Sequence, residues 1–147
     1  MPTGLRQWLR RASLRRMPPP LERQITFLYA QDLAASRHFY ETVLGLPLLR
    51  DQGRCAIYAG PGGALLGVCL ANGPRDNQDP RREGGVVLTL VTPAVEQWHA
   101  HLLALGIATE GAPAESSGFG ITHFFLRDPA GYLLEIQRFA VPLPAAG

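Results

Sequence analysis

Two copies of one pattern follow each other along the chain, and this repeat restricts the fold more than any other feature of the sequence. In the first copy, an apolar run beginning at Ile25 leads into a helix-like segment that ends at Gly45. In the second copy, a run beginning at Val86 leads into a similar segment that ends at Gly106, 61 residues after the first in each case. Tandem copies of one supersecondary unit predict a pseudo-symmetric fold with its functional site between the halves.

Apolar alternation and capping residues predict a strand, a helix and three further strands in each half. In the first half, Asp32 is the expected N-cap of the first helix. In the second half, Thr92 is the expected cap, Pro93 the first helical residue, and the Pro-, Ser- and Gly-rich segment 112–120 a mobile loop. The expected strands are 24–30, 46–49, 55–59, 64–70, 86–91, 107–110, 121–126 and 132–139, and the expected helices are 33–44 and 94–105. The predicted fold class is α+β, with two tandem βαβββ modules forming a curved mixed sheet around a cleft and the helices outside.

Length and composition describe one globular domain with a basic extension. The chain has 147 residues, of which 46% are hydrophobic, which suffices for one core. We expect a basic N-terminal arm (1–23), a domain (24–139) and a C-terminal tail (140–147). Within the domain, modules 24–70 and 85–139 are joined by a polar linker, 71–84.

Charge is concentrated in the arm, where residues 1–16 can form a basic amphipathic helix. Three interpretations stay open for it: a disordered tail, an upstream start with Met17 as the biological start, or a helix that docks on a membrane or a partner. A formal net charge of +2 over the whole chain gives no reason to expect nucleic acid as a partner.

The two cysteines, Cys55 and Cys69, lie in apolar strand-like runs without CxxC spacing. This pattern favours buried reduced thiols over a disulfide framework and therefore a cytoplasmic protein. No apolar run approaches the ~20 residues that a membrane span needs.

Two motifs resemble those of the vicinal oxygen chelate superfamily, which includes glyoxalase I, extradiol dioxygenases, fosfomycin-resistance transferases and bleomycin-resistance proteins. The first is Phe39-Tyr40-x-x-Val43-Leu44-Gly45-Leu46, and the second is Asp128-Pro129-Ala130-Gly131-Tyr132-x-x-Glu135. The resemblance covers roughly residues 24–139. It implies paired βαβββ modules around a cleft, a small-molecule ligand and a homodimer, formed either side by side or by module swapping across the linker.

The resemblance also implies metal-ligand positions, and most of them hold side chains that cannot bind a metal. They correspond to Ile25, to Val86 (or Val87 if the register slips by one) and to the strand 64–70, which contains no carboxylate. Only Glu135 matches a family ligand. Because a divalent ion in a cleft needs about three protein ligands, we expect no cofactor and no tightly bound metal, although a divalent ion stays an alternative.

Strand alternation places one histidine next to that carboxylate. Leu133, Glu135 and Gln137 share one face of the last strand, and His123 and Phe125 share the same side of the strand before it. His123 and Glu135 are therefore the candidate catalytic pair. Three interpretations remain: a structural hydrogen bond, a general acid–base pair, or two ligands of an unusual metal site.

The same alternation predicts an apolar, aromatic-rich pocket with few polar anchors, suited to a hydrophobic or planar small molecule. The alternative is that these side chains simply fill the cleft. The expected pocket residues are Ile25, Phe27, Tyr29, Tyr58, Cys69, Val86, Leu88, His123, Phe125, Leu133 and Glu135.

The missing ligands and the apolar pocket favour a small-molecule-binding protein of the glyoxalase/bleomycin-resistance type without the usual metal site. One alternative is a metal-dependent or His/Glu acid–base enzyme of the same superfamily, that is, a lyase, isomerase or dioxygenase. The other alternative is an interaction module that uses the basic arm.

Overall fold

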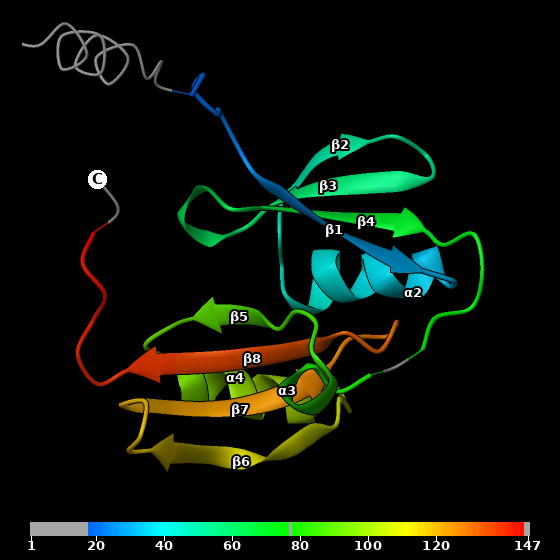
Figure 1. The fold of residues 1–147 in the computed structure, drawn as a ribbon. Coiled ribbons are helices and arrows are strands. Elements are labelled where there is room, and N and C mark those ends of the chain that lie inside the picture. The colour runs from blue at the N-terminus through cyan, green and yellow to red at the C-terminus, as the bar shows by residue number, and fades with distance from the viewer. Residues whose placement is uncertain (1–17, 77, 146–147) are drawn as a thin grey trace, which may run out of the picture.

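Two four-stranded mixed sheets of the same topology make up the protein (Figure 1). The computed structural model describes residues 18–76 and 78–145. The strand order is β1-β4-β3-β2 in sheet A and β5-β8-β7-β6 in sheet B. The strands are β1 (Ile25–Ala30), β2 (Leu48–Asp51), β3 (Cys55–Ala59), β4 (Leu65–Leu70), β5 (Leu88–Val91), β6 (Thr109–Ser116), β7 (Ile121–Arg127) and β8 (Leu133–Phe139). The α+β class and the two βαβββ modules are confirmed, with each module contributing a sheet of its own.

The first module's helix begins and ends where its capping residues predict. The side chain of Asp32 accepts a hydrogen bond from the Ala35 N–H at 3.0 Å, which caps α2 (Leu33–His38). The helix continues as a π-helical turn, η1 (Phe39–Val43), and the chain leaves it through Gly45 at φ +69°. A short 3-10 turn, η2 (Pro61–Gly63), connects β3 to β4.

The second module differs from the expected pattern at two places. Its helix α4 (Val95–Ala104) begins two residues after Pro93, with Ala94 at the N-cap, and the Thr92 hydroxyl accepts from the Ala94 N–H instead. The segment expected to be a mobile loop is largely the long strand β6, because β7 provides a partner for its backbone as far as Ser116. A short helix, α3 (Pro80–Glu83), interrupts the linker.

Each sheet has a helix face, covered by α2 and η1 or by α4, and an opposite open face. In Figure 1, α4 lies behind sheet B and α3 lies in front of it. Buried side chains from both modules, such as Leu28, Tyr40, Leu102 and Ile136, form one core cluster on the helix faces. The two modules therefore share one hydrophobic core.

A buried hydrogen bond joins the modules inside this core. The Tyr40 hydroxyl, on η1, donates to Oδ2 of Asp128 at 2.7 Å. Burial raises the pKa of Tyr40 well above its usual value, so the phenol stays protonated as a donor. Burial also raises the pKa of Asp128, while the bond from Tyr40 and the Tyr132 and Ala130 amides oppose that shift.

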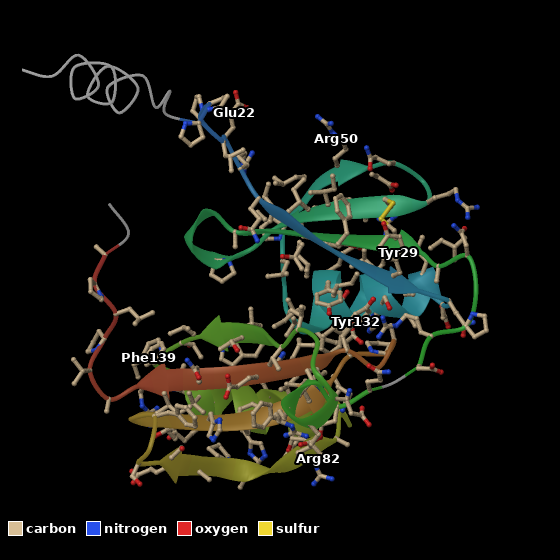
Figure 2. The ribbon with its side chains drawn as sticks, in the orientation of Figure 1. Glu22, Tyr29, Arg50, Arg82, Tyr132 and Phe139 are labelled. Carbon is tan, nitrogen blue, oxygen red and sulfur yellow. A yellow bond between two sulfur atoms is a disulfide. The ribbon has the colours of Figure 1, made fainter. Side chains whose placement is uncertain are left out.

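The expectation of reduced thiols is wrong, because Cys55 and Cys69 form a disulfide, the yellow bond in Figure 2. The two residues are direct cross-strand partners in the β3–β4 ladder, a register that the sequence pattern did not supply. Disulfides are typical of oxidising compartments, so the argument from thiols no longer supports a cytoplasmic location. Among the described residues, no helix is long and apolar enough to cross a membrane.

Most of the N-terminal arm lies outside the described residues, since the structure describes the chain from Pro18 onward. The three interpretations of residues 1–16 therefore stay predictions. Residues 18–23 are extended and exposed, and Figure 2 shows Glu22 well away from both sheets.

Reducing the disulfide is expected to lower the free energy of unfolding by about 3 kcal/mol, because the bond closes a loop of this length in the unfolded chain; the cysteines are 14 residues apart. Denaturant unfolding with and without reductant measures the change, and the double variant Cys55→Ala/Cys69→Ala should be insensitive to reductant. Two reactive thiols in the unfolded but unreduced wild type would show that the bond is absent.

Tyr40→Phe is expected to lower the free energy of unfolding at neutral pH by about 1–3 kcal/mol, because it removes a donor from a buried carboxylate. Urea unfolding measures this, and Tyr29→Phe is the control, since the structure shows no side-chain hydrogen bond from the Tyr29 hydroxyl among the described residues. The decrease in the free energy of unfolding should become smaller as the pH falls through the raised folded-state pKa of Asp128. The reason is that the bond from Tyr40 stabilises the ionised carboxylate more than the protonated carboxyl group. A loss independent of pH would contradict this assignment.

Candidate functional site

His123 and Glu135, the predicted catalytic pair, lie together on the open face of sheet B. The register pairs Phe125 with Glu135 and His123 with Gln137 across β7 and β8, which places all four on the open face. Nδ1 of His123 lies 2.6 Å from Oε2 of Glu135. Their side chains are 21% and 13% exposed, so the pair is mostly buried but reaches the surface.

Thr89 completes this group, and strand alternation in the sequence had not suggested it. Thr89 pairs with Glu135 in the parallel β5–β8 ladder, and its hydroxyl donates to Oε1 of Glu135 at 2.9 Å. Both carboxylate oxygens are thus engaged, and His123 is oriented by Glu135. A carboxylate that orients an imidazole is the arrangement that general acid–base catalysis uses; the catalytic role itself stays a prediction.

A pocket of about 270 Å³ lies between β1, the linker and the beginning of β8, and none of His123, Glu135 and Thr89 lines it. Leu133 belongs to the pocket and precedes Glu135 by two residues on the same face, which corresponds to about 7 Å along the strand. Four of the expected pocket residues line it: Phe27, Val86, Leu88 and Leu133. Sequence reasoning missed the polar members of its wall, Arg75, Arg127 and Tyr132.

Phe27 reaches this pocket because its neighbour on β4 is a glycine. Phe27 pairs with Gly67 in the parallel β1–β4 ladder, and its ring lies over the glycine so closely that any side chain there would overlap it. The ring is 41% exposed and forms an apolar wall of the pocket.

Three other expected pocket residues lie elsewhere on sheet A. Ile25 and Tyr29 are on its open face but do not line the pocket. Tyr29 is 49% exposed, on the first sheet, as Figure 2 shows. Cys69 is on the same face and is held in the disulfide. With two separate sheets, the open face of sheet A does not close over that of sheet B.

Two of the expected faces are wrong. Tyr58 is fully buried on the helix face, where its hydroxyl donates to Glu41 at 2.7 Å and its ring stacks on Tyr40. Leu88 pairs with the buried Leu134 on the helix face of sheet B and reaches the pocket only from the sheet edge. In both strands the assumed register was off by one residue, which exchanges the two faces.

The linker helix α3 covers part of the open face of sheet B. The Arg81 guanidinium lies 4.5 Å above the centre of the Phe125 ring and bonds Glu110 at 2.8 Å. The hydrogen bond from Arg81 also lowers the pKa of Asp79 to about 2. Phe125 is therefore covered by an ion-paired arginine and is not a free pocket wall.

The donor set does not fit a divalent metal site. On the open faces, β1 presents Ile25 and Phe27, and β5 presents Thr89 and Val91. Within 18–76 and 78–145, no group of three His, Cys, Asp or Glu side chains is placed to hold a metal ion. His123 and Glu135 supply two donors, which bond each other, and a catalytic metal site needs about three protein ligands.

Two larger hollows, of about 390 and 410 Å³, lie at the boundary between the modules. They share an apolar lining that includes Leu44, Leu46 and Leu90, and neither contains a charged side chain. Thr89, which bonds Glu135, lines the first of these hollows. Charged side chains that could orient a ligand occur only in the smaller pocket among these three.

Comparisons with known proteins agree with this architecture. The model of the Glyoxalase/Bleomycin resistance protein/Dioxygenase superfamily matches residues 23–136. None of the curated proteins matches the chain significantly.

Among solved structures, a glyoxalase/bleomycin resistance protein/dioxygenase from Nocardioides is 21% identical, with a TM-score of 0.67 over 97% of this chain and 98% of that one. A lactoylglutathione lyase from Agrobacterium tumefaciens is 27% identical, with a TM-score of 0.60 over 83% and 96%. The fosfomycin resistance protein FosX from Listeria monocytogenes is 11% identical, with a TM-score of 0.63 over 83% and 94%.

Proposed function

The chain belongs to the glyoxalase/bleomycin resistance protein/dioxygenase superfamily, and on this premise we propose that it binds a small organic molecule in the pocket beside His123 and Glu135 without a metal ion. The fold alone does not choose an activity: structures similar to it include a lactoylglutathione lyase and a fosfomycin resistance protein. Whether the chain only binds a ligand or also catalyses a reaction therefore has to be argued from the side chains of the site.

The observation that carries the proposal is the composition of the pocket wall. Apolar side chains (Phe27, Leu28, Val86 and Leu133) meet two arginines and a tyrosine in one hollow. Ligand sites of small molecules have this character, with a mostly apolar lining and a few polar groups that set orientation. Leu133, which lines the pocket, precedes Glu135 by two residues on β8, so a bound molecule would lie near this carboxylate.

The side chains at the family's ligand positions support binding without a metal. Apolar residues replace the ligands of the first strand in each module, and Glu135 is satisfied by Thr89 and His123. A buried carboxylate is costly unless it is paired or hydrogen-bonded. We propose that Glu135 now serves to hold His123 and Thr89 in place at the pocket.

Equilibrium dialysis against zinc, nickel, manganese or iron(II), followed by elemental analysis, is expected to leave far less than one metal per chain in both wild type and Glu135→Gln. Thr89→His is the matched positive control, because it puts a third donor beside Glu135 and His123. One tightly held equivalent in the wild type that Glu135→Gln removes would overturn the metal-free proposal.

We also propose that two copies of the chain form a homodimer. The strands β1 and β5 are at the ends of their sheets, so each has an edge available for pairing. Apolar side chains are exposed on these strands: Phe27 at 41%, Tyr29 at 49% and Val91 at 51%. A second copy would cover this surface, either side by side or by exchange of modules across the linker.

Light scattering at micromolar concentrations is expected to give the mass of two chains for the wild type. Tyr29→Glu should shift the population to monomer, because it places a charge in the proposed interface. Phe119→Ser is the matched control, since Phe119 is 81% exposed in a turn between β6 and β7, away from both edges. A monomeric wild type would refute the dimer.

A further inference from the structure

The pocket near the His123–Glu135 pair has a positively charged wall that the proposed function does not explain. Arg75, from the linker, and Arg127, from the end of β7, both line it. The other charged side chain in the lining is Asp76, which is exposed. The wall thus carries two guanidinium groups against one carboxylate that remains in contact with solvent.

Arg75 is held in position by an aromatic ring while its polar atoms lack an acceptor. Its guanidinium carbon lies 3.6 Å from the centre of the Tyr132 ring, close enough for a cation–π interaction. Its Nε is buried and has no hydrogen-bond partner among the described residues. Buried donors are almost always satisfied, so this atom indicates a place for an acceptor that the protein does not provide.

The nearby buried carboxylate does not fill that place. Asp128 directs its oxygens to the Tyr40 hydroxyl and to the backbone amides of Ala130 and Tyr132. The negative charge of Asp128 partly offsets the positive charge of Arg75, but the two side chains are not hydrogen-bonded to each other. Arg75 therefore has no carboxylate bonded to it among the described residues, and a ligand in the pocket that it lines can offer an acceptor to its guanidinium.

Arg127 places a second positive charge in the same hollow. Its Nη1 donates to the carbonyl oxygens of Gly131 at 2.8 Å and Gln78 at 3.0 Å, which fixes the guanidinium against the wall. Its hydrogen bonds to the described residues thus go to neutral carbonyls. The charge of Arg127 contributes to the lowered pKa of Asp79 without a hydrogen bond between the two side chains.

Apolar side chains make up another part of the pocket wall. The Phe27 ring lies across Gly67, and Leu133 and Val86 border the same space. A ligand that satisfies both walls needs an apolar, preferably planar body and an anionic group at one end.

We propose that the pocket selects small organic acids, in which a carboxylate bonds Arg75 and Arg127 and a planar apolar body packs against Phe27 and Leu133. This inference rests on the proposed function, because it names the class of ligand for the same pocket. Charge-assisted hydrogen bonds between guanidinium and carboxylate are strong and geometrically specific, so the acid should be preferred over a neutral molecule of the same shape.

Two probes of nearly the same shape test the proposal: 1-naphthaleneacetate and its neutral amide, 1-naphthaleneacetamide. Isothermal titration calorimetry on the full chain at neutral pH, with ligand-detected NMR for weak binding, gives the ratio of their affinities. We expect the wild type to bind the acid about tenfold or more tightly than the amide, as one charge-assisted hydrogen bond predicts. This ratio does not depend on whether any variant folds.

Variants assign the preference to the arginine wall. Arg75→Met keeps an apolar stem over Tyr132 and should reduce the acid-to-amide ratio to near one, while leaving amide binding almost unchanged. Arg127→Met should lower the ratio in the same direction. Arg82→Met is the matched control: Arg82 is on α3, as Figure 2 shows, is exposed and does not line the pocket, so the ratio should stay at the wild-type value.

The outcomes separate this inference from the proposed function. Equal binding of acid and amide by the wild type, or an acid preference that survives Arg75→Met and Arg127→Met, would overturn the inference and leave a pocket for neutral ligands. Failure of both probes to bind would contradict the inference and also count against the proposed function. Gly67→Val, which displaces the Phe27 ring, should weaken both probes together if the pocket is the binding site.

Discussion

The hydrogen bonds of the buried Asp128 carboxylate are the interactions on which the rest of the molecule depends. It accepts hydrogen bonds from the Tyr40 hydroxyl at 2.7 Å, the Tyr132 amide at 2.8 Å and the Ala130 amide at 3.0 Å. The first bond ties the modules together, and the other two shape the turn between β7 and β8. This turn positions Tyr132. The Tyr132 hydroxyl accepts a hydrogen bond from the Tyr29 amide on β1, and its ring packs against the Arg75 guanidinium. One satisfied buried charge thus connects the module interface to the wall of the pocket.

Much of the fold followed from the sequence, because its signals are local. The repeat, the Asp32 cap and the glycine stops predicted two βαβββ modules, and strand alternation placed His123 on the same side of the sheet as Glu135. Strand alternation could also have placed Arg127 on the open face, since it follows Phe125 by two residues along β7. The errors arose where position depends on partners distant in the chain. A shift of one residue in register moved Tyr58 and Leu88 to the helix faces, and the pairing of Cys55 with Cys69 depends on how β3 aligns with β4. Arg75 lies in a linker without periodicity, so only the folded chain shows that it stacks on Tyr132.

On the proposed function, this chain would keep the shared fold and a binding pocket without the metal site of the family. Two strands that the family resemblance associates with metal ligands present isoleucine, phenylalanine, threonine and valine on their open faces, and the remaining carboxylate is satisfied by neighbouring side chains. The smaller pocket is formed in part by Phe27, whose ring lies over Gly67. Function is therefore argued from these side chains rather than from the fold.

The central claim is that this chain holds a small organic molecule, and no metal, beside the Glu135–His123 pair. Native mass spectrometry of the full chain, purified without added metal or ligand, tests it most directly. The account predicts the mass of two polypeptides plus an organic adduct on each chain, which dissociates as an anion on collisional activation and is lost in Arg75→Met. A stoichiometric adduct with the mass of a transition metal, retained in Arg75→Met and absent in Glu135→Gln, would contradict it.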